Sequence, residues 1–218
     1  MSLRYIVNVF KGEGITIYRN DGLEKGKIRE RIIRVLLNHP QGLSKYKIWK
    51  KSDASFSWVH KYLENLENIG LILNTKVIDY RGLINHWKNI HIQPARHDFL
   101  IQNPDEFLKN IDLGYALTTY LGENLVQKYL FPTRYDVYIK KDDLQYWKEK
   151  LSHEGLVGKG NFRLLVDDDH VFYNANLINE LHVVSMPQLI LDLLVERGVC
   201  AEAAEMLIVK EESKYVQN

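Results

Sequence analysis

The sequence is nearly free of cysteine, since Cys200 is the only one among 218 residues. A single thiol excludes an intramolecular disulfide framework and a zinc site built from several cysteines, and it fits a reducing compartment. No apolar run is long enough to span a bilayer, and the run within residues 1–10 is too short for a signal peptide. We therefore expect a cytoplasmic protein with no membrane partner.

Several motifs of catalysis and cofactor binding are also absent. The sequence holds no GxGxxG fingerprint, no Walker A loop and no GxSxG nucleophile elbow. The acidic run at residues 167–169 lacks the ligand spacing of an EF-hand loop, so we interpret it as a solvated turn. His86, His91 and His97 are spaced too irregularly to share one helix face. We expect no metal site, no cofactor and no catalytic residue.

Charge is distributed unevenly along the chain. The full sequence has a net charge of +1, yet residues 25–61 hold ten Lys/Arg against only Glu30 and Asp53, a local charge of about +8. The remaining residues include 19 basic and 26 acidic side chains, a net charge of −7. A strongly basic segment in an otherwise acidic chain indicates a polyanionic partner.

The basic segment also has the pattern of a winged helix-turn-helix. Apolar spacing predicts helices over about 27–38, 44–51 and 55–69, followed by two short β-rich runs that form a wing. Ser44 is a suitable N-cap for the second helix, with Leu43 and Ile48 at the spacing of a hydrophobic staple. On the first helix, the side chains expected to face water are Arg29, Glu30, Arg31 and Arg34.

In a helix-turn-helix, the N-terminal residues of the third helix contact base edges in the major groove. The residues at these positions are Ser55, Ser57, Trp58, His60 and Lys61. Lysines placed to neutralise phosphates are Lys45, Lys47, Lys50, Lys51 and, at the wing tip, Lys76. Two alternatives stay open. The first is that Trp58 is a core residue rather than a contact residue, because exposed tryptophan is uncommon. The second is that the charge run is only a solvated helix face, or that this winged helix binds a protein instead of DNA.

The remaining pattern predicts an α+β protein with two domains. A short hairpin is expected over residues 4–19. We expect a winged-helix domain over residues 1–92 and an α/β domain with a mixed sheet over residues 93–218, with the boundary marked by the segment at 94–97. Ser185 with Gln188 three residues later is a capping box that opens a helix. The other helices of the second domain are expected at about 105–111, 116–129, 142–153 and 201–209, and the strands at 133–140, 162–166 and 181–184.

Five segments of the second half together resemble AbiEi-type antitoxins, the DNA-binding partners in type IV toxin–antitoxin pairs. The segments are GYALTTYLGENL at 114–125, FPTRYDVYIK at 131–140, NFRLLV at 161–166, VVSMPQLILDLL at 183–194 and AEAAEML at 201–207. The resemblance implies a winged helix joined to an antitoxin domain. It also implies repression of the protein's own operon through promoter inverted repeats, and action against a nucleotidyltransferase-like toxin without a stable complex.

The second half also resembles a degenerate nucleotidyltransferase fold. Active members have a glycine-containing turn before a helix and a strand with two acids at i and i+2 that hold divalent metal. Here residues 117–120 contain no glycine, and the strand reads Asp136-Val137-Tyr138. One carboxylate cannot assemble a two-metal site, so we interpret Asp136 as an ordinary strand residue. A nucleotide-transferring enzyme and a regulator whose second domain binds a ligand or a partner protein remain alternatives.

Overall fold

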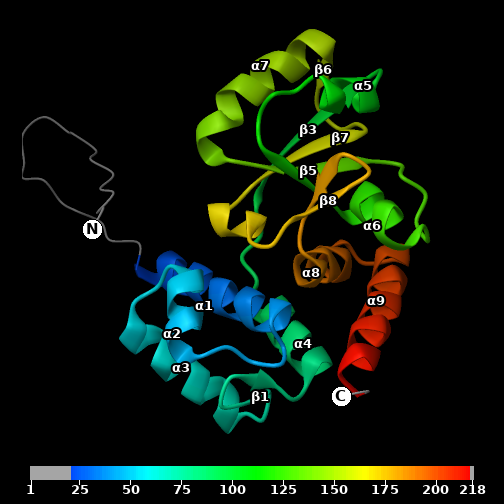
Figure 1. Ribbon diagram of the computed structural model, residues 1–218. Coiled ribbons are helices and arrows are strands. Elements are labelled where there is room, and N and C mark those ends of the chain that lie inside the picture. Colours follow the sequence, from blue (N-terminus) through cyan, green and yellow to red (C-terminus); the bar gives the residue numbers. More distant parts are fainter. Residues whose placement is uncertain (1–20, 217–218) are drawn as a thin grey trace, which may run out of the picture.

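The computed structural model describes residues 21–216, which form an N-terminal helical half and a second half built on a sheet (Figure 1). The hairpin predicted at residues 4–19 lies outside the described residues. The elements of the first half are α1 (Asp21–Asn38), α2 (Lys45–Ser52), α3 (Phe56–Asn68), β1 (Ile72–Leu73), β2 (Lys76–Val77) and α4 (Tyr80–Ile90). The order of three helices and a hairpin follows the prediction, and β1 pairs with β2 antiparallel.

The second half begins with a strand that the sequence pattern did not predict. Its strands are β3 (Ala95–Ile101), β4 (Tyr115–Thr118), β5 (Tyr135–Ile139), β6 (Gly155–Val157), β7 (Phe162–Val166), β8 (Asn176–Ile178) and β9 (Leu181–Val183). Its helices are α5 (Pro104–Lys109), α6 (Thr119–Gln127), α7 (Leu144–Glu154), α8 (Met186–Glu196) and α9 (Val199–Val216), with short 3₁₀ turns η1 (Lys141–Asp143) and η2 (Asp169–Phe172).

The strands form one seven-stranded sheet in the order β6-β3-β7-β5-β4-β9-β8. The β5–β7 and β4–β9 pairs are parallel and the others antiparallel, so the mixed sheet predicted from the sequence is confirmed. Among residues 21–216, no helix combines the length and the apolar character needed to cross a bilayer.

Strand alternation divides the sheet into two faces. On β5, Val137 and Ile139 belong to the core that includes Trp147 and Leu151 of α7. Tyr138 between them belongs to the core formed with α8 and α9. The same alternation therefore directs Asp136, two residues before Tyr138, toward the α8 face of the sheet.

The core on the α8 face continues into the N-terminal half. Buried residues of α1, α3 and α4 form one apolar cluster with residues of α8, α9 and the sheet. In Figure 1, α8 lies between the sheet and the α1–α4 layer, and α9 runs beside α4. The proposed boundary near residue 93 stays a prediction, but the apolar core is continuous across it.

Three predictions for the second half need correction. Residues 115–118 are the buried strand β4, and the helix begins only at Thr119, because a fully buried strand has the same apolar run as a helix. Ser185 precedes α8 but makes no side-chain capping bond, because its hydroxyl accepts from Asn38 at 3.2 Å and the Gln188 side chain accepts from Arg34. The last helix does not end near residue 209 but continues to Val216, and Arg81 of α4 contacts Glu212 on that extension.

Candidate functional site

We call the solvent-facing side chains of residues 45–61 the α2–α3 surface. Ser44 caps α2 as predicted, its hydroxyl accepting a hydrogen bond from the Lys47 amide at 3.3 Å. Asp53 then adopts a left-handed conformation, with φ of 47°, that turns the chain into α3. Ile48 and Val59 are fully buried where the two helices meet. This packing directs the opposite sides of α2 and of the first turns of α3 toward solvent.

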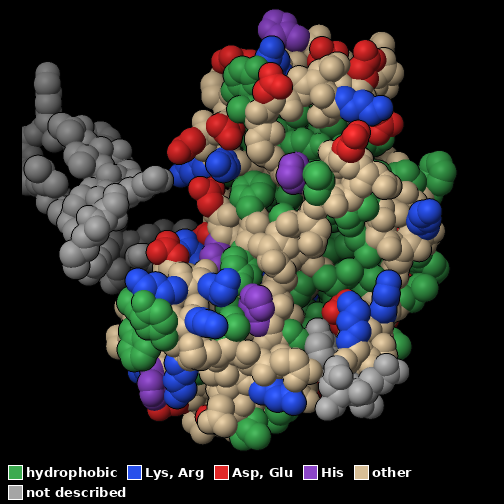
Figure 2. Space-filling model, viewed as in Figure 1, with side chains coloured by type: hydrophobic (Ala, Val, Ile, Leu, Met, Phe, Trp, Pro, Cys, Tyr) green, Lys and Arg blue, Asp and Glu red, His purple; other side chains and the backbone are tan. Residues whose placement is uncertain are grey.

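The predicted contact residues lie on or next to the α2–α3 surface. The exposed side chains among them are Lys47, Lys50, Lys51, Ser55, Ser57 and Lys61, with Lys76 on β2, while Lys45 and His60 are partly exposed. Asp53 is the only acid within residues 45–61. The group therefore forms a cationic surface rich in hydrogen-bonding side chains (Figure 2).

Two of these residues have side chains that contact other parts of the protein. Trp58 is partly buried against the core, and its ring meets Tyr62 edge to face at 5.7 Å. The Lys51 ammonium lies 5.4 Å from the centre of the Tyr173 ring in the second half. The Trp58 ring therefore belongs mainly to packing, and Lys51 joins the α2–α3 surface to the second half.

Part of the basic segment is neutralised inside the protein. Lys27 pairs with Asp167 at 2.5 Å, and Arg31 donates to Asp168 through two nitrogens at 2.8 and 2.5 Å. The Asp167 and Asp168 side chains are only 3% and 12% exposed, so the prediction of a solvated turn is wrong for both. The local charge available to an external partner is correspondingly smaller than the sequence suggested.

Arg34 was predicted to face water but is buried, at 2% exposure. Its guanidinium donates to Gln188 at 2.9 Å, contacts His170 Nδ1 at 2.9 Å, and lies 5.1 Å from the centre of the Trp87 ring. Gln188 in turn donates to Asp192 at 2.8 Å. A chain of hydrogen bonds thus runs from α1 through α8.

The chain of hydrogen bonds ends at the sheet. Asp192 accepts from Thr118 at 2.6 Å and from Tyr138 at 3.1 Å. Burial raises the pKa of Asp192 to about 6, against the opposing effect of these donors. Burial and the Arg34 charge lower the pKa of His170 to about 4, so the ring is neutral at pH 7 and its Nε2 can donate to the Lys51 carbonyl at 2.8 Å.

Glu30 was also expected to face water and is 1% exposed. Its carboxylate accepts from Trp87 Nε1 at 3.0 Å and from the Ile92 amide at 3.1 Å, and it lies 2.7 Å from His91 Nδ1. Burial alone would raise the pKa of Glu30. The hydrogen bond and charge of His91, with the charge of Lys27, outweigh burial and lower this pKa to about 2.

The low pKa of Glu30 predicts a pH-dependent contribution to stability. Glu30→Gln should lower the free energy of unfolding by about 3 kcal/mol at pH 7, because each pKa unit corresponds to about 1.4 kcal/mol. A lowered acid pKa stabilises the fold above the unfolded value near 4.5 and loses that effect as pH falls toward 2. Urea unfolding of both proteins at pH 7 and pH 3 measures this. A difference that is as large at pH 3 as at pH 7 would contradict it.

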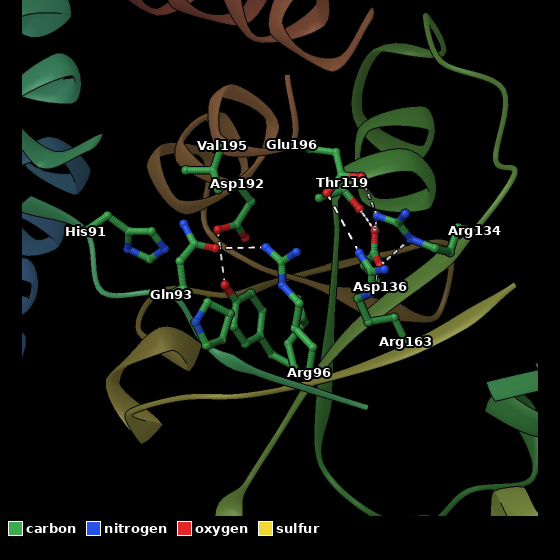
Figure 3. A pocket seen from close by; sticks show the side chains of 13 residues that line it. His91, Gln93, Arg96, Thr119, Arg134, Asp136, Arg163, Asp192, Val195 and Glu196 are labelled. Carbon is green, nitrogen blue, oxygen red and sulfur yellow. Dashed lines mark hydrogen bonds and ion pairs between the residues drawn. The ribbon is translucent and has the colours of Figure 1, made fainter. Parts of the chain in front are cut away.

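A second cluster of polar side chains lies on the α8 face of the sheet, across four neighbouring strands. The pairing register places Thr118, Asp136, Arg163 and Asp98 in one row over β4, β5, β7 and β3. Arg163 donates to Asp98 at 2.6 Å, which lowers the pKa of that carboxyl. Figure 3 shows Asp136 and Arg163 of this row among the side chains that line a small pocket beside α8.

Asp136 is enclosed by cationic and hydroxyl donors rather than by other acids. Arg134 donates to both of its oxygens, at 2.7 and 2.8 Å, and Thr119 donates to one of them. Arg134 also pairs with Glu196 at the end of α8 at 2.9 Å (Figure 3). Thr119 has φ of 46°, a strained conformation for a β-branched residue, at the turn where the sequence lacks glycine.

Comparison with protein-family models, with curated proteins and with solved structures finds no match to this chain. The chemistry of the two sites therefore has to be judged from their own geometry. Around Asp136, the Arg134 guanidinium donates to both carboxylate oxygens. Within residues 21–216, no three His, Cys, Asp or Glu side chains are grouped to hold a metal ion.

The buried interface residues were missed by the sequence reasoning, although α1 carried a signal. Residues 32–37 read Ile-Ile-Arg-Val-Leu-Leu, and all six are buried. A helix that is apolar on all sides must be covered on all sides. Arg34 within such a segment could therefore have been predicted to be buried and paired.

Proposed function

We propose that this protein is a sequence-specific DNA-binding transcriptional regulator whose winged helix-turn-helix lies in residues 21–92. The observation that carries the proposal is the α2–α3 surface. Its lysines remain available to solvent, whereas Lys27, Arg31 and Arg34 of α1 are bound to the second half. Exposed lysines on the second and third helices of a helix-turn-helix can contact the phosphates of a duplex.

The resemblance to AbiEi-type antitoxins supports a narrower form of this proposal. The protein would repress its own operon by binding inverted repeats in the promoter, and it would counter a nucleotidyltransferase-like toxin. The polar row around Asp136 supports a regulatory rather than a catalytic second half. Both oxygens of its carboxylate are engaged by Arg134, so this group is poorly suited to hold a divalent metal.

Two single substitutions on α3 test the proposal. Lys61→Ala should weaken binding to a duplex of the promoter about tenfold in 0.1 M salt, because one fewer counterion is released. It should lower affinity for all duplex sequences alike, whereas His60→Ala should mainly relax sequence preference. Lys61 is exposed, and the partly exposed His60 ring contacts Glu64 on the same helix at 3.2 Å, so thermal stability should change little in either variant.

The measurement is a fluorescence-anisotropy titration with promoter and scrambled duplexes. Lys88→Ala, an exposed lysine on α4 outside the α2–α3 surface, is the matched control and should bind as the parent does. If Lys61→Ala and His60→Ala also bind as the parent does, α3 is not the recognition helix.

A further inference from the structure

Three aromatic side chains lie together on the α2–α3 surface, and neither the charge pattern nor the predicted contacts include them. Tyr46 and Phe56 are 58% and 48% exposed. The Tyr46 and Trp49 rings meet at 5.2 Å with an interplanar angle of 69°, and the Trp49 and Phe56 rings meet at 5.9 Å and 87°. Large apolar side chains gathered in solvent indicate a surface that contacts a partner.

The aromatic group is surrounded by positive charge. The Lys50 ammonium lies 4.3 Å from the centre of the Trp49 ring and 5.9 Å from that of Tyr46. The sequence of α2, KYKIWKKS, contains four lysines and no acid. Figure 2 shows a hydrophobic patch bordered by Lys and Arg side chains at the edge where Figure 1 places α2. The partner of such a surface carries negative charge around an apolar group.

Phe56 lies at the N-terminal end of the proposed recognition helix, where residues of a helix-turn-helix contact base edges. It is the first residue of α3, between the exposed hydroxyl residues Ser55 and Ser57. Trp49, which packs partly against the core, supports its ring from the side. A phenyl ring already held in place loses little conformational freedom on binding.

Duplex DNA offers one apolar group in the major groove, the 5-methyl group of thymine. We infer that Phe56 recognises a thymine methyl, with Tyr46 extending the apolar contact and the surrounding lysines holding the adjacent phosphates. This inference rests on the proposed function and adds a base preference to it. Phe56 is then a specificity-determining residue that hydrogen-bonding patterns alone would not reveal.

The test uses thymine and uracil, which differ only in this methyl group. Duplexes that the full-length protein binds are first selected from a random-sequence pool, and the best is then synthesised with deoxyuridine replacing each thymidine in turn. At the contacted position, the parent should bind the uracil duplex about fourfold more weakly, the equivalent of about 0.8 kcal/mol for one buried methyl group. Phe56→Ala should bind both duplexes with equal affinity. Phe131→Ala, which removes an 80% exposed phenyl ring in the second half, is the matched control and should discriminate as the parent does.

The outcomes separate the inference from the proposed function. Loss of discrimination in Phe56→Ala alone, with its melting temperature preserved, supports the inference. A parent that binds every uracil duplex as tightly as the thymine duplex overturns the inference and leaves DNA binding intact. Discrimination that persists in Phe56→Ala places the methyl contact elsewhere and also overturns it. If no duplex is selected, or single strands bind more tightly, the proposed function itself fails.

Discussion

Arg34→Ala is expected to lower the free energy of unfolding by about 2–6 kcal/mol, because each of two buried acceptors left without a donor costs about 1–3 kcal/mol. The substitution leaves the side-chain oxygen Oε1 of Gln188 and the Nδ1 atom of His170 without their donor. It also removes the cation that lies against the Trp87 ring. Buried acceptors without donors lose their hydration and gain nothing in return. Because α1 and α8 meet at this point, the loss weakens the contact between the two halves of the protein.

Arg81→Ala is the matched control for Arg34→Ala. Arg81 also joins the two halves, through Glu205 and Glu212 of α9, but its side chain is 37% exposed. Exposed ion pairs contribute at most about 1 kcal/mol. Chemical denaturation of the two variants at pH 7 compares the sites directly. Equal losses in both variants would mean that the Arg34 network is not the main polar connection between the halves.

Reversing two charges on the α2–α3 surface is expected to have the largest effect on binding. If about seven phosphates are contacted, the parent should show a log–log salt slope of about −6, and each lost contact should reduce the slope by about 1. Lys50→Glu combined with Lys61→Glu should therefore give a slope of about −4. It should also lower affinity at 0.1 M salt about a hundredfold or more.

A control with the same net charge distinguishes local contacts from overall charge. Lys140→Glu combined with Lys159→Glu replaces two exposed lysines of the second half and changes the net charge of the protein by the same amount. This double variant should retain the salt slope of the parent, with a small loss of affinity from the altered total charge. Parallel losses in the two double variants would show that general electrostatic attraction, and not the α2–α3 surface, determines binding.

The local patterns of the sequence predicted much of the first half. The Ser44 cap and the Leu43 and Ile48 spacing depend on residues close together in the chain, and the helices they define are present. The exposed lysines of α2 were predictable for the same reason. Side-chain periodicity on a short helix directly specifies which residues face solvent.

The polar interface could not be predicted in the same way. Arg34 and Gln188 are 154 positions apart, and their contact depends on how α8 packs against α1. The row that contains Asp136 depends on a strand register that includes β3, which the sequence pattern did not predict. Thr118 illustrates the same limit, because its hydroxyl contacts Asp192 only once β4 pairs within the sheet.

If the protein binds DNA as proposed, the position of α8 has a consequence for the geometry of that binding. The helix contributes apolar residues to a core shared by the sheet and by α1 and α4, so the half that carries the α2–α3 surface and the sheet pack against the same helix. Two copies related by a twofold axis through their second halves would present their recognition helices at a single separation. The distance between repeats on the duplex would then be dictated by how α8 is seated, far from any residue that contacts a base.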